Sequence, residues 1–205
     1  MNKILNTSLL ILLTTQSILA FDINKLDVPE NFKVEIFVED IEAPRQMAEG
    51  EDGYIFVGSK KGLVYAMRDH DGNGKIDDVE IIAKDLNDSS GVAYHEGSLF
   101  IAEIDKVWRI DNIEKQLADF NDTVLEKTLV TDDLPSDAWH GRKWIMVDKD
   151  GSILLNVGAP CNVCLKEDER YATILRYRDN SWIIEARGVR NTVGFDIHPI
   201  NNHLY

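Results

Sequence analysis

One local pattern recurs along the chain: an apolar strand, a charged turn and a second apolar strand. Copies begin at Met47, Val92, Ile145 and Phe195, so successive starts are 45, 53 and 50 residues apart. Propeller blades consist of several short antiparallel strands each, and their sequences repeat at a period of about 40–50 residues. The pattern therefore predicts an all-β fold, and within that class an incomplete β-propeller of about three to four blades.

The expected strands are short runs rich in β-branched and aromatic residues. They cover residues 33–40, 53–59, 62–68, 98–104, 106–110, 152–158, 173–179 and 181–187. One short segment, 111–122, has a helical pattern instead. A β-sandwich is the alternative architecture, but a sandwich does not predict the same turn recurring at this spacing, so the propeller is favoured.

The fourth copy of the repeat breaks off within its strand pattern at Tyr205. Because a propeller needs at least about four blades to close, we interpret the chain as the N-terminal part of a longer propeller.

The first twenty residues differ from the rest. Lys3 gives a positive start, residues 9–13 are an unbroken apolar run, and Ala20 ends a short apolar stretch. This order is typical of a secretory signal peptide, so we expect cleavage after Ala20, a domain covering 21–205, and a periplasmic or secreted protein. The apolar run is too short to span a bilayer, which predicts no membrane span after cleavage. A buried N-terminal helix is the alternative.

The net charge of −14 argues against nucleic acid as a partner and suits a divalent cation better. The chain has two cysteines, Cys161 and Cys164. In an exported protein such a pair is most simply a disulfide, although a redox-active pair stays open. Leu165 occupies the position where a c-type haem would need histidine, and two thiolates are too few for a structural zinc site.

Residues 69–80, DHDGNGKIDDVE, have the complete register of an EF-hand calcium loop, with Gly74 at the sharp turn. The expected ligands occupy positions one, three, five, seven, nine and twelve: Asp69, Asp71, Asn73, Lys75 through its carbonyl, Asp77 and Glu80. The flanks read as strands, where an EF-hand has helices. We therefore expect a structural Ca²⁺ site at a hairpin tip; a solvated acidic turn without an ion is the alternative.

Candidate catalytic residues lie in the second half of the chain. His140 precedes the inner-strand pattern of one repeat, and Arg190 and Asn191 precede that of the next. Residues just ahead of successive inner strands converge on the mouth of a propeller. A histidine there can act as a general base, while arginine and asparagine can bind carboxylates or a carbonyl. A surface histidine and a turn with an ion pair are the alternatives.

Three segments together resemble the glucose/sorbosone dehydrogenase family: the stretch 68–103, which begins RDHDGNGKIDDVEIIAKDL and ends GVAYHEGSLFIAE, WHGRKWIMVDKDGSILLNVGAPCNVC (139–164) and ARGVRNTVGFDIHP (186–199). The sorbosone dehydrogenase-like branch is the more similar, because of the NVG-x-x-CNVC pattern. The resemblance implies a secreted six-bladed propeller that uses pyrroloquinoline quinone (PQQ), and it covers the N-terminal half of such a domain.

By this resemblance His140 is the catalytic base, which removes the hydroxyl proton while hydride passes to the quinone, and Arg190 and Asn191 contact the quinone. The implied substrate is a small sugar or aldehyde, and the electrons pass to an external acceptor. The later blades of the family add cofactor contacts, so we expect this chain to be inactive alone. A non-catalytic calcium-stabilised propeller used for binding and a lactonase-type hydrolase with calcium at its mouth are the alternative functions.

Overall fold

The computed structural model describes residues 22–121 and 123–205. The expected signal peptide, residues 1–20, lies outside the described residues. Among the residues that are described, no helix is both long enough and apolar enough to cross a bilayer.

The chain divides into two units, and the boundary between them in the sequence lies between Ile36 and Phe37. The described part of the first unit contains one 3₁₀ turn, η1 (Ile23–Lys25). Asp22 caps this turn, because its Oδ1 accepts a hydrogen bond from the Asn24 N–H (3.1 Å).

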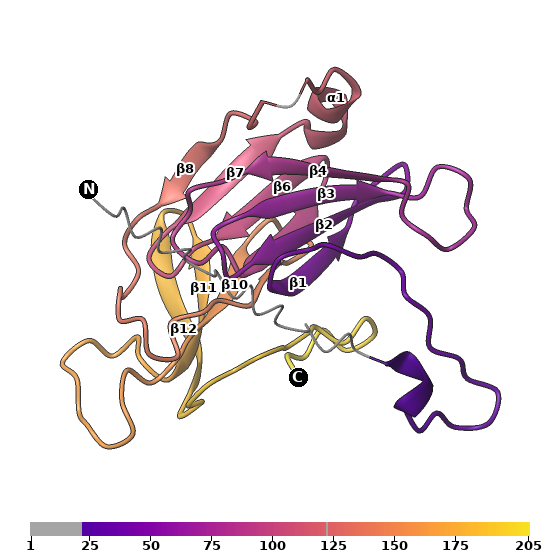
Figure 1. Ribbon diagram of the computed structural model, residues 1–205. Helices are drawn as coiled ribbons and strands as arrows, with labels where there is room; N and C mark the ends of the chain where they lie inside the picture. The colour runs from indigo at the N-terminus through magenta and orange to yellow at the C-terminus, as the bar shows by residue number, and fades with distance from the viewer. Residues whose placement is uncertain (1–21, 122) are drawn as a thin grey trace, which may run out of the picture. The chain divides into compact units, whose positions relative to one another are not determined.

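The second unit contains three four-stranded antiparallel sheets within the described residues (Figure 1). The strands of every sheet follow chain order, so each sheet is a meander. The first sheet contains β1 (Pro44–Glu49), β2 (Tyr54–Ser59), β3 (Val64–Arg68) and β4 (Asp78–Ala83); the second contains β5 (Gly91–His95), β6 (Ser98–Ala102), β7 (Val107–Asp111) and β8 (Thr128–Thr131); the third contains β9 (Ile145–Val147), β10 (Ile153–Val157), β11 (Thr173–Arg178) and β12 (Ser181–Arg187). A short helix, α1 (Ile113–Ala118), lies between β7 and β8.

The sequence repeat corresponds to the first two strands of each sheet. Its first three copies form β1–β2, β5–β6 and β9–β10. The fourth copy forms a hairpin with a bridge between Ile197 and Leu204. The predicted all-β class is confirmed, and the successive four-stranded meanders are propeller-like, although the described residues form no closed ring.

Neighbouring sheets pack through apolar side chains. One buried cluster joins the first sheet to the second and includes Phe56, Val64, Ile82, Val92, Leu99, Ile101 and Ile110. Another joins the second sheet to the third and includes Ala93, Phe100, Val107, Ile145, Leu155 and Leu175. Full burial of each large apolar side chain contributes about 1.5–3 kcal/mol, so these two clusters hold the sheets side by side.

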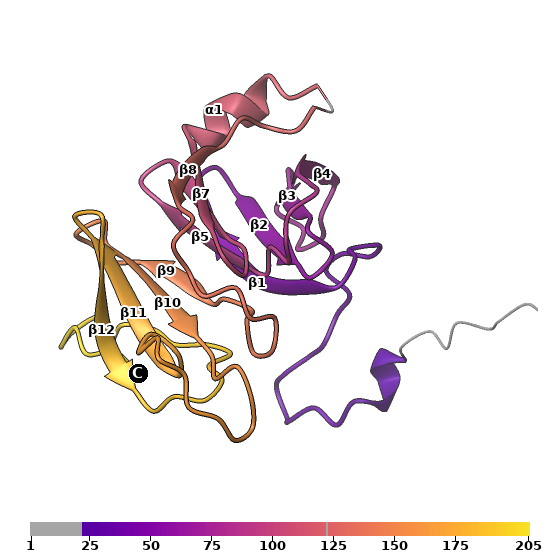
Figure 2. The same ribbon diagram turned by 90° about the vertical axis from the view of Figure 1, so that its left-hand side faces the viewer.

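The first strands of the three sheets, β1, β5 and β9, come together where the sheets meet (Figure 2). Gln46 of β1 is buried there. Its Nε2 donates to the Ile145 carbonyl (2.6 Å), and its Oε1 accepts from the Ile145 N–H (3.0 Å). The Gln46 N–H donates to the Ser90 carbonyl (3.2 Å). One amide side chain therefore links β1 to β9 as a neighbouring strand would.

The prediction of a strand at residues 33–40 is wrong, because this segment has no strand structure. Val34 and Ile36, on the N-terminal side of the boundary between the units, remain exposed. On the other side, the Phe37 carbonyl accepts a hydrogen bond from the Ile76 N–H (3.2 Å). Strand propensity describes a fit to a pleated, half-buried surface, and no described strand pairs with this segment.

The other expected strands correspond to β2, β3, β6, β7, β10, β11 and β12. The helical pattern at 111–122 forms only the six residues of α1. The four-residue strand β8 was not predicted, because its sequence is too short to show an alternating pattern.

Candidate functional site

A cavity of about 250 Å³ lies beside β1 and the segments that precede β9 and follow β12. Its wall consists of Pro44, Arg45, Gln46, Ser90, His140, Arg142, Lys143, Trp144, Asn191, Thr192 and Val193. The fold thus brings the predicted site residues His140 and Asn191 to one cavity, although they lie far apart in sequence.

His140 is held by the segment that directly follows β10. Its backbone has a left-handed φ of 53°. Gly158, just after β10, approaches so closely that a Cβ there would lie 2.4 Å from the His140 carbonyl oxygen. The His140 Nδ1 lies 2.8 Å from the Ala159 carbonyl oxygen. Because a carbonyl can only accept, this bond places the proton on Nδ1 and leaves the lone pair of Nε2 available to take a proton.

Asn156, buried in β10, organises the segment between His140 and β9. Its Oδ1 accepts from the Trp144 N–H (2.6 Å), and its Nδ2 donates to the Arg142 carbonyl (3.0 Å). Asn156 was not among the site residues predicted from the sequence. Its signal was a lone amide within an otherwise apolar strand, and buried amides need partners.

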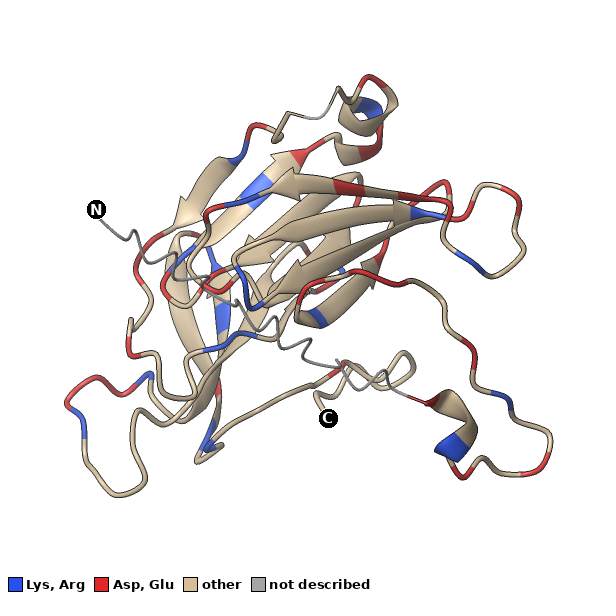
Figure 3. Ribbon diagram, in the orientation of Figure 1, with Lys and Arg blue, Asp and Glu red and all other residues tan. Residues whose placement is uncertain are grey.

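The cavity wall is cationic, although the chain is acidic. Figure 3 shows Asp and Glu spread over many loops and strand ends, with Lys and Arg between them. The cavity wall contains Arg45, Arg142 and Lys143 but no Asp or Glu. Arg142 is paired with Asp88 outside this wall (Nε–Oδ2 2.9 Å). These three cations were not predicted, because they are not recognisable by spacing.

Lys143 is almost completely buried, with 3% of its surface exposed. Its Nζ donates to the Gly141 carbonyl (2.5 Å). Burial lowers the pKa of Lys143 to about 8, while the charges of Asp105 and Asp88 oppose that decrease. The Lys143 ammonium group therefore loses its proton more readily than the ammonium group of a solvent-exposed lysine does.

Arg190 is not part of the cavity wall. Its Nη2 donates to the Asn162 Oδ1, and its carbonyl accepts from the Ala159 N–H (2.7 Å). Ala159 thus bonds to Arg190 through its N–H and to His140 through its carbonyl. Both predicted residues therefore bond to the backbone of this one residue.

Cys161 and Cys164 form a disulfide, the simpler of the two alternatives that the sequence left open. The disulfide closes a short turn that follows Ala159 and contains Asn162. Val163 in this turn is almost fully exposed, so the turn is not held by burial of its own side chains.

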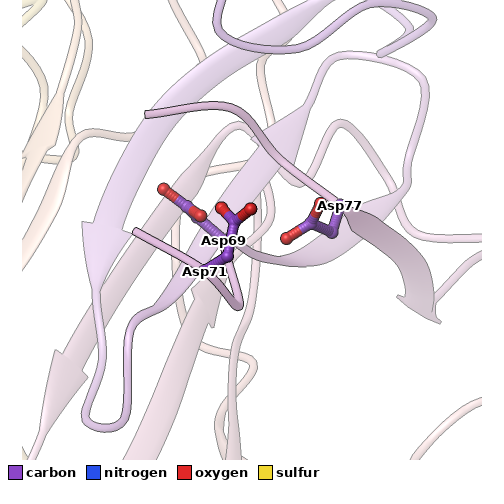
Figure 4. Close-up of side chains that lie close together, drawn as sticks. All are labelled: Asp69, Asp71 and Asp77. Carbon is purple, nitrogen blue, oxygen red and sulfur yellow. The ribbon is translucent and has the colours of Figure 1, made fainter. Parts of the chain in front are cut away.

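The second candidate site is the loop between β3 and β4. Asp69, Asp71 and Asp77 each offer a carboxylate oxygen, and these oxygens all lie within 4.8 Å of one another (Figure 4). The loop joins the strands of one hairpin, as the strand-like flanks predicted. Three carboxylates at this spacing repel one another unless a cation lies between them.

Backbone amides hold the Asp69 carboxylate in place. Its Oδ2 accepts from the Gly74 N–H (2.8 Å), and its Oδ1 accepts from the Gly72 N–H (2.8 Å). These bonds lower the pKa of Asp69 below its ordinary value, because they stabilise the ionised form, and the bond from Gly74 has the largest effect. Both glycines have positive φ, 82° and 70°, a backbone conformation that glycine adopts without strain.

The remaining predicted ligands are placed differently. The Asn73 Oδ1 accepts a bond from the Lys75 N–H (2.9 Å) within the loop. Asp77 also accepts from the His70 N–H (2.8 Å). Glu80 lies in β4 opposite Ala66 and is outside the group of three aspartates.

The meandering sheets and the cavity beside their first strands define an all-β, propeller-like protein. No family model matches the chain. It is 33% identical over 191 residues to an uncharacterized protein of Borreliella burgdorferi. The matched region covers 88% of this chain and 48% of the relative. The chain therefore spans about half the length of this relative.

Solved structures with a similar fold include the holo form of the PQQ domain of pyranose dehydrogenase from Coprinopsis cinerea. The match has a TM-score of 0.64 at 15% identity, and it covers 78% of this chain and 42% of the pyranose dehydrogenase chain. The Trichoderma reesei enzyme of carbohydrate-active family AA12 is also similar. Its iodide structure has a TM-score of 0.67 at 15% identity and covers 83% of this chain and 46% of its own. Its calcium structure has a TM-score of 0.64 at 14% identity, with coverages of 80% and 45%. At these identities the likeness shows a shared fold.

Proposed function

We propose that this chain is the N-terminal part of a PQQ-dependent dehydrogenase, of the sorbosone dehydrogenase-like branch, that oxidises an aldose or aldehyde. The observation that carries the proposal is the position of His140 in a cationic cavity with its Nε2 free to accept a proton. The fold shared with the PQQ domain of a pyranose dehydrogenase supports it. The complete protein would be a six-bladed propeller.

The residues of the cavity fit a carboxylated quinone. Arg45, Arg142 and Lys143 supply positive charge for its carboxylates. The hydroxyl oxygen of Thr192, another wall residue, is buried and has no hydrogen-bond partner among the described residues. A buried hydroxyl of this kind is costly until a ligand or water bonds to it, so a polar ligand would satisfy it. Asn191 would add an amide contact.

When bound, PQQ would supply the hydride acceptor. In this mechanism the Nε2 of His140 takes the proton of the substrate hydroxyl, which is that of a ring-form aldose or of a hydrated aldehyde, as the hydride leaves the carbon. The Ala159 carbonyl then stabilises the resulting imidazolium through the Nδ1–H bond. Arg190, adjacent to His140 through Ala159, would provide positive charge toward the quinone oxygens.

The β3–β4 loop is proposed to bind Ca²⁺ in a structural role. Asp69, Asp71 and Asp77 would supply carboxylate oxygens, and Asn73 and the Lys75 carbonyl would add further ligands. Glu80, the sixth residue of the expected set, lies in β4 outside this cluster, so its place would be taken by other oxygens. Ca²⁺ requires six to eight oxygen ligands at about 2.3–2.6 Å, and the three clustered carboxylates supply the charge. The calcium structure of the similar AA12 enzyme is compatible with this proposal.

The remaining parts of the proposal concern location and partners. Residues 1–20 would be removed as a signal peptide, which leaves 21–205 in the periplasm or outside the cell. The substrate would be a small sugar or aldehyde, and an external acceptor would take the electrons. The acidic net charge disfavours nucleic acid.

The test is reconstitution of the full-length protein with PQQ and Ca²⁺, followed by reduction of an artificial acceptor with aldoses and aldehydes. His140→Ala should lower turnover about 10²–10⁴-fold, as expected for loss of a general base. His95→Ala, at a histidine outside the cavity wall, is the matched control and should keep parental turnover. A His140→Ala variant as active as the parent would contradict the role of His140.

A further inference from the structure

We propose that Asn162 is a positioning residue, which holds the Arg190 guanidinium in place for an anionic ligand. The inference rests on the proposed function, in which Arg190 supplies positive charge toward the quinone oxygens. It adds the residue that orients this arginine and the element that presents that residue.

Two separate contacts hold Arg190. The Ala159 N–H donates to its carbonyl (2.7 Å), which fixes the backbone, and the Asn162 Oδ1 accepts from its Nη2, which fixes the end of the side chain. The preceding residue is also anchored, because the Val189 N–H donates to the Ala172 carbonyl (2.9 Å). Among the described contacts, Asn162 is the side-chain partner of the guanidinium.

The chemistry of this pair leaves Arg190 able to bind a ligand. A guanidinium has five N–H donors in a planar fork, and the Asn162 oxygen occupies the donor on Nη2. The other donors stay available for the oxygens of an anionic ligand. Because Asn162 is neutral, it orients the arginine and leaves its positive charge intact. An aspartate at this position would neutralise that charge.

The Cys161–Cys164 disulfide presents Asn162. Its two cysteines lie on either side of Asn162 in the sequence, so the bond between them closes the turn that contains this residue. Val163 and Leu165 are 96% and 99% exposed, so side-chain burial does not order the turn. Lys166 makes the next anchor, an ion pair with Asp137 (3.4 Å). The covalent link therefore restricts the conformations of Asn162.

The same segment also contacts His140, since the Ala159 carbonyl accepts from its Nδ1. Ala159 and Asn162 are three positions apart. The segment that orients the proposed base therefore also orients the arginine proposed to contact the cofactor. The disulfide begins two residues after Ala159, which makes a backbone bond to each of them.

Asn162→Ala tests the inference in the full-length protein, with PQQ binding to the apo form measured by quenching of tryptophan fluorescence. Ordering a long side chain costs about 0.5–1.5 kcal/mol, so the loss of Asn162 should raise the Kd about 2–10-fold. Asn162→Asp keeps an acceptor and should hold the arginine. Val163→Ala, on the same turn, is the matched control and should leave the Kd unchanged.

A double-mutant cycle separates positioning from a general effect on the loop. If Asn162 acts through Arg190, adding Asn162→Ala to Arg190→Ala should change the Kd no further. The Cys161→Ser/Cys164→Ser variant should weaken binding like Asn162→Ala, and the two changes should not add. Equal losses from Asn162→Ala with and without Arg190 would overturn the inference.

A second readout does not depend on the cofactor. The ¹⁵N relaxation of the Arg190 side chain should show an ordered guanidinium in the parent and in Asn162→Asp, and a mobile one in Asn162→Ala. A parent that fails to bind PQQ would overturn the proposed function. An Arg190 side chain equally mobile in the parent and in Asn162→Ala would overturn the positioning role of Asn162.

Discussion

Three polar side chains are buried close to the cavity, and they are stabilised in two ways. Gln46 and Asn156 each bond to backbone groups through both ends of the amide. Lys143 has one bond to a carbonyl, and its charge is offset only by Asp88 and Asp105 nearby. A buried charge costs more than a buried amide, and of these three side chains Lys143 is the one that can gain or lose a proton.

Lys143 should make the stability of the protein depend on pH. Burial lowers its pKa in the folded chain from 10.5 to about 8, so between these values the unfolded chain binds more protons. The contribution of this group to the free energy of unfolding therefore rises from pH 8 to 10.5. Relative to Lys143→Met, the parent should gain roughly 3 kcal/mol at most across this window.

Urea unfolding at several pH values measures this difference. Lys84→Met, at an exposed lysine, serves as the control and should show no such gain. A difference between parent and Lys143→Met that stays constant from pH 7 to 10.5 would contradict the buried ammonium.

At the scale of elements, hairpins and their loops carry both candidate sites. The β3–β4 hairpin carries the three clustered aspartates, and the segment after β10 carries the contacts to His140 and Arg190. In each case, regular strand pairing ends and a loop with defined hydrogen bonds begins. Binding residues on loops that a rigid scaffold positions are a common arrangement.

The calcium loop can be tested with Asp71→Ala. Removing one of three carboxylates lowers the charge available to Ca²⁺, so the affinity should fall at least about tenfold. Calorimetric titration with Ca²⁺ measures this, and chelation with EDTA should lower the Tm of the parent more than that of the variant. Asp132→Ala, in another loop, is the control; parental heats from Asp71→Ala would argue for a solvated turn.

At the scale of the whole molecule, the three sheets depend on two kinds of contact. Apolar clusters join their faces, and Gln46 joins the first sheet to the third. The apolar contacts stabilise the packing without specifying one register. The Gln46 amide adds two directed bonds to a single residue, Ile145, and so sets how β1 lies against β9.

Gln46→Ala should therefore be among the more damaging substitutions away from the apolar core. It leaves the N–H and carbonyl of Ile145 without partners in a buried position. Each orphaned group costs about 1–3 kcal/mol, so the free energy of unfolding should fall by about 2–6 kcal/mol in urea titrations. Gln116→Ala removes one bond to the Asp111 carbonyl and should cost about 1 kcal/mol; equal losses in both variants would contradict the bridge.

The sequence alone determined the local elements. The repeated strand–turn–strand pattern predicted an all-β fold, and the first three copies are the first hairpins of the three sheets. The loop at 69–80 was likewise recognisable, since all its candidate ligands are neighbours in the chain. These features are local, because strand alternation and turn residues act within a few positions.

Only the tertiary structure decided which distant residues meet. Residues 33–40 have a strand pattern but no strand structure, since a strand requires a neighbour that the pattern cannot name. Arg45 and Asn191 line one cavity, and Asn162 meets Arg190. Such contacts depend on how whole sheets pack and on their register, which no spacing within a single strand specifies.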